Sequence, residues 1–84
     1  MYNLYILKCA DGTLYTGITT DVKRRIAEHN SSILGAKYTR ARLPVKLVYT
    51  KSFKNRSSAS KTEAKIKKLS RPKKLALIKK AKTT

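Results

Sequence analysis

The feature of this sequence that most constrains its fold is the pair Asp11-Gly12, which separates two short apolar runs. The runs, 2–9 and 13–19, contain several of the aromatic and β-branched residues that favour strands. An Asp-Gly pair between such runs is a strong signal for a β-hairpin. The sequence therefore predicts that the two runs pair as antiparallel strands.

The length of the hairpin loop decides which side chains share a face, because side chains alternate between the faces of a sheet with period two. A two-residue loop would place Tyr5 and Tyr15 on opposite faces. A three-residue loop, 10–12, whose glycine adopts the left-handed conformation, pairs Tyr5 with Gly17 instead. We predict this longer loop, which projects both phenols to one side.

A helix is predicted over residues 21–30, with Asp21 as its N-cap. Residues that recur at helical spacing on one face are Val22, Arg25, Ile26 and His29. A cation and an imidazole on this face, beside two tyrosines, form a polar cluster that packing alone does not require. Ordinary structural roles stay open for both, because arginine stems often lie on apolar surface and histidine is often half-buried.

The chain resembles the GIY-YIG nuclease superfamily, in particular its small stand-alone bacterial members. The resemblance runs from residue 2 to about residue 70 and rests on Tyr5, Tyr15-Thr16-Gly17, Arg25, His29, Gly35-Ala36-Lys37-Tyr38-Thr39 and Glu63. The first triplet is Asn3-Leu4-Tyr5 in place of Gly-Ile-Tyr, and the second is Tyr-Thr-Gly in place of Tyr-Ile-Gly. Both triplets keep the tyrosine of the motif, and the second keeps its glycine, Gly17.

The resemblance implies hydrolysis of nucleic-acid phosphodiesters, with Tyr5, Tyr15, Arg25, His29 and Glu63 as the catalytic residues. It implies that Glu63 holds one divalent cation, and that Arg25 helps to neutralise the charge developing on phosphorus. Tyr5 or a metal-bound water would supply or deprotonate the nucleophile. A tyrosine base needs nearby positive charge, because only about one phenol in a thousand is ionised at pH 7. His29 is the more natural proton carrier.

Charge is unevenly distributed along the chain, whose formal net charge is +17. Residues 1–34 hold four cations against three acids, whereas residues 35–84 hold the other seventeen cations and one acid. This asymmetry is typical of proteins that bind a polyanion, and we expect nucleic acid, DNA ahead of RNA. A membrane surface is the weaker alternative, because no predicted helix carries a large aromatic-rich apolar face. A protein partner also stays open.

Residues 31–44 are predicted to form a basic loop around Tyr38. Lysine and arginine in such a loop contact backbone phosphates, and an aromatic ring among them stacks or donates a hydrogen bond. Packing of the Tyr38 ring on the edge of the sheet is an equal alternative. The residues that we predict to bind nucleic acid are Lys37, Tyr38, Arg40, Arg42 and Lys67.

The third strand, 45–53, is predicted from the alternation of Val45, Leu47 and Tyr49 with their neighbours. A helix over 58–69 follows, and its apolar stripe consists of Ala59, Thr62, Ile66 and Leu69. A last basic helix, 72–82, has Ser70 as its cap and Leu75 and Ile78 as its anchors.

Glu63, the only acid among the last fifty residues, lies within the apolar stripe of the helix 58–69. A carboxylate on a packing face is costly unless it is paired or binds a cation. One alternative is a salt bridge to Arg25 or to Lys67. The other is a single Mg²⁺ or Mn²⁺ ion, because magnesium prefers oxygen ligands and is often held by one or two carboxylates plus phosphate. Glu28 is predicted to fall off the face that carries Arg25.

The sequence thus predicts one α+β domain over residues 1–84, with a core at 2–70 and a three-stranded antiparallel sheet flanked by helices. A chain of this length has room for one core, and no apolar run approaches the ~20 residues of a membrane span. We expect a cytoplasmic protein in which Cys9 is a small buried hydrophobe. The predicted function is a metal-dependent endonuclease in DNA repair or processing. The alternative is a non-catalytic basic nucleic-acid-binding module or an accessory subunit of a repair complex.

Overall fold

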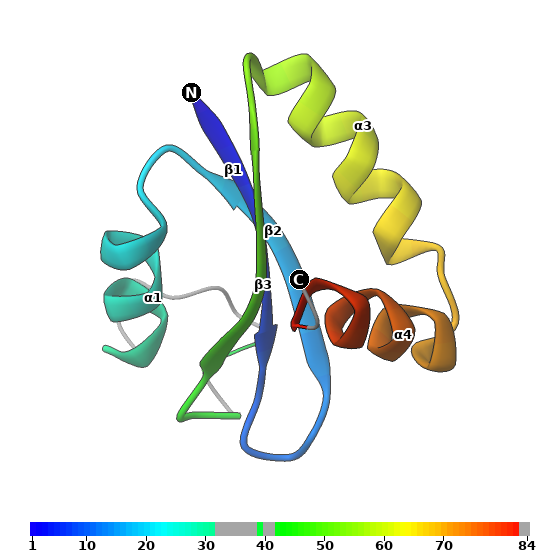
Figure 1. Cartoon of the computed structure of the whole chain (residues 1–84). Coiled ribbons are helices and arrows are strands. Elements are labelled where there is room, and N and C mark those ends of the chain that lie inside the picture. The colour runs from blue at the N-terminus through cyan, green and yellow to red at the C-terminus, as the bar shows by residue number, and fades with distance from the viewer. Residues whose placement is uncertain (32–38, 40–41, 83–84) are drawn as a thin grey trace.

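A computed structural model of the chain describes residues 1–31, 39 and 42–82. The elements, in chain order, are strands β1 (Tyr2–Lys8) and β2 (Leu14–Thr19), helix α1 (Val22–Asn30), strand β3 (Lys46–Phe53), and helices α3 (Arg56–Lys67) and α4 (Arg71–Lys82). Helix α1 lies on one side of the sheet, and α3 and α4 lie on the other (Figure 1). The α+β prediction, with its antiparallel sheet of three strands, is confirmed.

The hairpin has the three-residue loop that the sequence predicts. Gly12 has a φ of 85°, a value that glycine adopts without strain, and the Cys9 N–H donates to the Thr13 carbonyl at 2.8 Å. In the resulting register Tyr5 pairs with Gly17. The phenols of β1 and β2 therefore project from one face, as predicted.

Strand β1 is the centre of the sheet, since the strand order is β2-β1-β3. Its residues 4–7 are all buried, because helices cover both faces of the sheet. On the α3/α4 side the buried core residues are Leu4, Ile6, Ile66 and Ile78. On the α1 side they are Tyr5, Leu7, Cys9 and Val45. The tyrosine of β1 is thus part of the core on the α1 side.

Strand β3 does not alternate in the way that the sequence predicts. Its register against β1 shifts between Ile6, which pairs with Tyr49, and Leu7, which pairs with Leu47. Val48 is the extra residue at this bulge, and both it and Tyr49 pack against the core on the α3/α4 side. The bulge is the physical reason why the predicted alternation is wrong in the middle of the strand.

Helix α3 begins two residues earlier than predicted, because the side chain of Asn55 caps it by accepting a hydrogen bond from the Ser58 N–H at 2.9 Å. Helix α4 is turned so that Leu77 and Ile78 pack on the core, while Leu75 is 42% exposed. The prediction of Leu75 as an anchor is therefore wrong. No helix of the described residues is long and apolar enough to cross a membrane.

Gly17 is required by the ring of Tyr5, which lies directly over it. A Cβ atom added at residue 17 would lie 2.5 Å from the Tyr5 hydroxyl oxygen and 2.7 Å from Cζ. We predict that Gly17→Ala lowers the free energy of unfolding by about 1–3 kcal/mol, because the added methyl overpacks this contact. Urea denaturation measures the loss.

The control for this prediction is the same substitution in a Tyr5→Leu background, where the phenol ring that clashes is absent. There we expect Gly17→Ala to cost much less, so that the two substitutions are coupled. An equal cost in both backgrounds would show that the close approach of Tyr5 is not what requires glycine.

Candidate active site

Three aromatic rings meet on the face of the sheet that α1 covers. The centroids of Tyr5 and Tyr15 are 6.4 Å apart, and the ring of His29 stands edge-on to both, at 5.8 and 5.3 Å respectively. Tyr5 comes from β1, Tyr15 from β2 and His29 from α1. The register of the hairpin and the placement of one helix are sufficient to bring them together.

The start of α1 is fixed by two short-range contacts immediately after β2. Asp21 caps the helix, because its Oδ1 atom accepts a hydrogen bond from the Arg24 N–H at 3.0 Å. The Asp21 N–H in turn donates to Oγ1 of Thr19 at 3.2 Å. The helix therefore begins at a set distance from the sheet, which determines where Arg25 and His29 lie.

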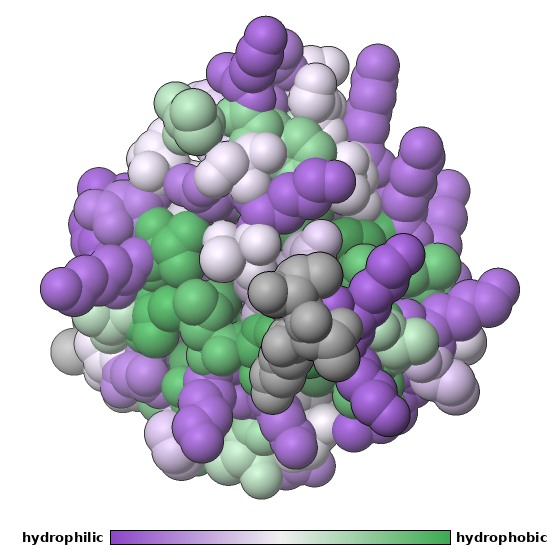
Figure 2. All heavy atoms as spheres, viewed as in Figure 1, coloured by the Kyte–Doolittle hydropathy of each residue, from purple (hydrophilic) through white to green (hydrophobic). Residues whose placement is uncertain are grey.

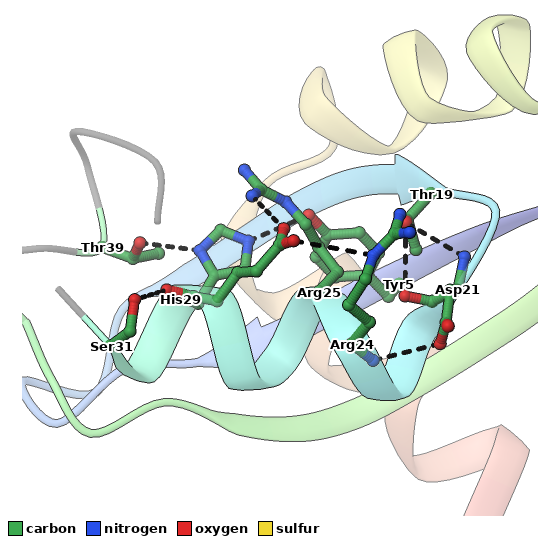
Figure 3. Close-up of polar contacts among 9 residues, drawn as sticks. Tyr5, Thr19, Asp21, Arg24, Arg25, His29, Ser31 and Thr39 are labelled. Carbon is green, nitrogen blue, oxygen red and sulfur yellow. Dashed lines mark hydrogen bonds and ion pairs between the residues drawn. The ribbon is translucent and has the colours of Figure 1, made fainter. Parts of the chain in front are cut away.

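His29 is the one buried residue of α1, and none of its side chain is exposed. Its Nε2 atom lies 3.0 Å from the hydroxyl oxygen of Tyr5, and its Nδ1 atom lies 2.8 Å from Oγ1 of Thr39 (Figure 3). Both ring nitrogens thus have a buried hydroxyl partner. The imidazole is the middle member of a chain of three polar side chains.

Arg25 and Glu28 pair on the outer side of this chain. The Arg25 Nη1–H donates to Oε1 of Glu28 at 2.8 Å, and Oε2 of Glu28 lies 3.5 Å from Nε of Arg24. The prediction that Glu28 falls off the face of Arg25 is wrong, because residues three apart on a helix are neighbours and both side chains are long. Glu28 also raises the pKa of Arg25, so this guanidinium remains charged.

Burial dominates the acid–base properties of Tyr5. It raises the pKa of the phenol above its ordinary value, although a hydrogen bond from Arg25 acts in the opposite direction. The nearby guanidinium therefore does not outweigh the effect of burial on the pKa of this phenol. At neutral pH Tyr5 carries its proton.

The pKa of His29 is lowered, which keeps its imidazole neutral at physiological pH. Burial lowers the pKa of its imidazole, and the nearby charge of Arg25 lowers it further. A neutral imidazole has one nitrogen that accepts a hydrogen bond, and one of its two nitrogens faces the Tyr5 hydroxyl. The site therefore pairs a protonated phenol with a base able to receive its proton.

Glu63 lies on α3, the helix on the opposite side of the sheet from α1. Its side chain is 22% exposed, and Oε2 lies 3.5 Å from Nζ of Lys67. Of the two salt bridges that the sequence allowed, the structure contains the one to Lys67 and not the one to Arg25. The carboxylate is still near enough for its charge to raise the pKa of Tyr5.

Glu63 is the candidate ligand for a divalent cation at this site. The described residues contain no group of three or more histidine, cysteine, aspartate or glutamate side chains that could hold a metal. Glu63 would be a one-carboxylate ligand, which suits Mg²⁺ because this ion keeps several waters and takes phosphate oxygens from a substrate. The residues therefore fit a metal ion whose other ligands are water and oxygen atoms of the substrate.

A sequence model of the GIY-YIG catalytic domain matches residues 1–76 of the chain. The chain belongs to the GIY-YIG catalytic domain family. A UPF0213 protein of Desulfotalea psychrophila is 60% identical over 76 residues, which are 90% of this chain and 69% of the relative. A UPF0213 protein of Halobacterium salinarum is 56% identical over 77 residues, or 92% and 99% of the two chains. The UPF0213 proteins form a small group within the family.

Solved structures agree with this GIY-YIG assignment. The solution structure of a UPF0213 protein from Bacillus halodurans has a TM-score of 0.61 and 50% sequence identity, and covers 94% of this chain and 84% of that one. A second solution structure, of a protein from E. faecalis, has a TM-score of 0.60 and 46% identity, with coverage of 90% and 81%. The arrangement of sheet and helices that carries the GIY-YIG cluster is therefore shared with its relatives.

Two of the five residues predicted to bind nucleic acid, Arg42 and Lys67, lie in the described part of this GIY-YIG domain. Lys37, Tyr38 and Arg40 lie outside the described residues. Arg42 lies at the hairpin loop, where its Nε–H donates to Oδ2 of Asp11 at 3.0 Å, and Lys67 pairs with Glu63. These roles remain predictions.

Thr39 is the member of the buried chain to which the sequence assigned no role. It occurs in the run that carries the GIY-YIG resemblance, but a single threonine in a basic loop has no periodicity that indicates burial. Thr39 is buried, and its Oγ1 atom forms a hydrogen bond with Nδ1 of His29. This contact joins two residues that are ten positions apart in the sequence.

The lowered pKa of His29 predicts a specific dependence of stability on pH. Because the folded imidazole binds its proton less readily than the unfolded one, the unfolded state gains protons first as the pH falls through about 6.5. The free energy of unfolding should therefore decrease between pH 7.5 and pH 5.5, as measured by urea denaturation. His29→Gln should flatten this part of the curve, since the chain has no other histidine. If the free energy of unfolding depended on pH in the same way in both proteins, this would contradict the lowered pKa of His29.

Proposed function

We propose that this protein is a divalent-metal-dependent endonuclease that hydrolyses phosphodiester bonds in nucleic acid, DNA ahead of RNA. The observation that carries the proposal is the convergence of Arg25 and His29 on the hydroxyl of Tyr5. A partly exposed cation beside a buried phenol and a neutral imidazole would provide phosphate binding and proton transfer together. A purely structural core has no need of this combination.

The charge of the protein supports a polyanionic substrate. All four acids of the chain lie in the described part, and each is already engaged: Asp11 with Arg42, Asp21 as a helix cap, Glu28 with Arg24 and Arg25, and Glu63 with Lys67. The great majority of the 21 lysines and arginines therefore have no acid to neutralise them. Hydrophilic side chains project around much of the outline of the face in Figure 2.

Arg25 is the group that a phosphate would meet first. Only 2% of Tyr5 is exposed, whereas a quarter of the Arg25 side chain is accessible. A phosphate bound by the guanidinium would compete with Glu28 for its N–H donors, and it would lie next to the phenol that Arg25 also contacts. The guanidinium would then neutralise negative charge that develops on the phosphate oxygens.

Tyr5 and His29 would move the proton. In the proposed reaction the hydroxyl of Tyr5 receives a proton from the attacking water and passes its own to Nε2 of His29. The oxygen of that water bonds to phosphorus as the bond to the leaving oxygen breaks, and the leaving oxygen takes up a proton from solvent. This order avoids a free phenolate, which the raised pKa of Tyr5 disfavours. Tyr15, whose ring packs against both partners, would hold them in position.

Glu63 would hold the divalent cation, Mg²⁺ or Mn²⁺, through a carboxylate that is partly exposed. When bound, such an ion supplies electrostatic stabilisation of phosphate charge and a more acidic water. Lys67 would lose its partner Glu63 in that state and become available to a phosphate. A role in DNA repair or processing within the cytoplasm would follow from such an activity.

The proposal predicts that Glu63→Gln abolishes Mg²⁺-dependent cleavage of labelled DNA while leaving the protein folded. The stability cost should stay below about 1 kcal/mol, because the Glu63–Lys67 pair is partly exposed. DNA affinity, measured by fluorescence anisotropy, should be unchanged or slightly higher since one negative charge is removed. Lys67→Gln removes the same ion pair but keeps the carboxylate, so it should retain metal-dependent cleavage when the protein is saturating, even where the loss of this cation weakens DNA binding. Retained cleavage in Glu63→Gln would exclude the catalytic role.

The cationic surface predicts binding that depends strongly on salt and weakly on sequence. If four or more phosphates are neutralised, the slope of log K against log salt on duplex DNA should be about −3.5 or steeper. Anisotropy titrations in EDTA at several salt concentrations measure this slope without cleavage. A slope near zero would contradict a phosphate-contacting surface, and binding without cleavage in any metal would favour the non-catalytic binding module.

A further inference from the structure

A hollow lies at the end of the sheet where β1 ends, at Lys8, and β3 begins, at Lys46. Figure 1 shows this end of the sheet near the loop of the β1–β2 hairpin. The volume of the hollow is about 380 Å³, which is in the range of sites that bind small ligands. Its lining is mainly apolar and consists of Lys8, Cys9, Ala10, Pro44, Val45 and Lys46. The hollow is therefore separate from the cluster of Tyr5, Tyr15 and His29.

The floor of the hollow is formed by apolar residues of the core. Cys9 and Val45 are 4% and 5% exposed and belong to the buried cluster on the α1 side of the sheet. The backbone beside them already has partners, since the Cys9 N–H donates to the Thr13 carbonyl at 2.8 Å and the Ala10 N–H donates to the Arg42 carbonyl at 2.9 Å. Because these two donors are used, the floor suits the apolar face of a ring better than a strongly polar group.

Two lysines face each other at this hollow. Lys8 and Lys46 are direct partners across the β1–β3 ladder, and both are exposed. Like charges directly opposite each other destabilise a sheet. A lysine on an edge strand guards against aggregation, which accounts for Lys46 on β3 but not for Lys8 on the central strand. An anion bound between the two ammonium groups would relieve their repulsion.

The acids of the chain do not neutralise this pair. All four acids lie in the described part, and the ion pairs that they form there are with other cations. Asp11 is the nearest of them to Lys8 in the sequence, but its carboxylate binds Arg42 and the hydroxyl of Thr13. The natural partner of the two lysines is therefore an anion from outside the protein.

We propose that this hollow binds one unstacked nucleotide of a nucleic-acid strand, with the base against the apolar floor and the phosphate between Lys8 and Lys46. The two lysines supply the charge that a phosphate requires, and the floor buries the face of the base. The use of this site in cleavage rests on the proposed function. Binding of the nucleotide itself requires no cleavage.

The form of the hollow determines which nucleotides can enter. A base inside a duplex is covered on both faces by its neighbours, so only a base that has left the stack can reach the floor. Every base has an apolar face, and an apolar floor therefore accepts all of them. The site selects nucleic acid with an unpaired nucleotide and reads no sequence.

The test is a titration of the whole protein with thymidine 5′-monophosphate in EDTA, followed by backbone proton–nitrogen NMR spectra. We expect saturable shifts of the amide signals of Ala10 and Val45, which line the hollow. Inorganic phosphate, titrated in the same way, should bind about fourfold or more weakly, because it lacks the apolar surface of the base. Lys8→Gln and Lys46→Gln should each weaken binding of the nucleotide by about two- to fivefold, as expected for an exposed ion pair.

Lys54→Gln is the matched control, because it removes one exposed cation just beyond the other end of β3. The three variants have the same net charge, so general attraction to the protein falls equally in all of them. Lys54→Gln should leave the affinity for the nucleotide at the wild-type value. The same spectra verify that each variant is folded.

The proposal is overturned if the signals of Ala10 and Val45 do not shift, if inorganic phosphate binds as tightly as the nucleotide, or if Lys54→Gln weakens binding as much as the other two variants. Cleavage of labelled DNA by the wild-type protein with Mg²⁺ separates this result from the proposed function. Nucleotide binding without cleavage would support the site and count against the enzyme. Cleavage by a protein whose hollow binds no nucleotide would do the reverse.

Discussion

The candidate active site depends on the close approach of the Tyr5 ring to Gly17 across the β1–β2 hairpin. This approach exists because a three-residue loop, closed by Gly12 at positive φ, puts the two residues opposite each other. A loop one residue shorter would turn one of the two phenols to the other face of the sheet. The ring lies where a side chain on β2 would otherwise stand, and its hydroxyl is thereby directed to His29.

Burial of the contact between Tyr5 and His29 determines the protonation states of both side chains. The same desolvation raises the pKa of Tyr5 and lowers that of His29, so both groups are neutral at physiological pH. A neutral donor and a neutral acceptor can share a proton without the cost of a buried charge. Arg25, paired with Glu28 at the outer side, supplies a fixed positive charge beside them. The polar chain is thus stable when buried, and the guanidinium at its outer side is accessible to an anion.

Much of this arrangement could be predicted from the sequence, because it depends on local rules. The hairpin register, the Asp21 cap and the grouping of Tyr5, Tyr15, Arg25 and His29 follow from turn chemistry and from strand and helix periodicity. What the sequence did not predict depends on contacts between distant segments. The bulge at Val48, the choice of Lys67 as the partner of Glu63, and the burial of Thr39 against His29 are set by packing in three dimensions.

We propose that the hydroxyl of Tyr5 is a reacting group and that the surrounding cluster cleaves phosphodiesters. Single-turnover cleavage of labelled DNA by Tyr5→Phe, in excess over substrate and with Mg²⁺, tests it most directly, because the substitution keeps the ring over Gly17 and removes only the oxygen. Tyr49→Phe, on the other side of the sheet, is the matched control. If the Tyr5 hydroxyl takes part in the reaction, we expect Tyr5→Phe to cleave at a rate at least about 100-fold below that of wild type. Tyr49→Phe should cleave at the wild-type rate. Equal cleavage rates for Tyr5→Phe and the wild-type protein would contradict it.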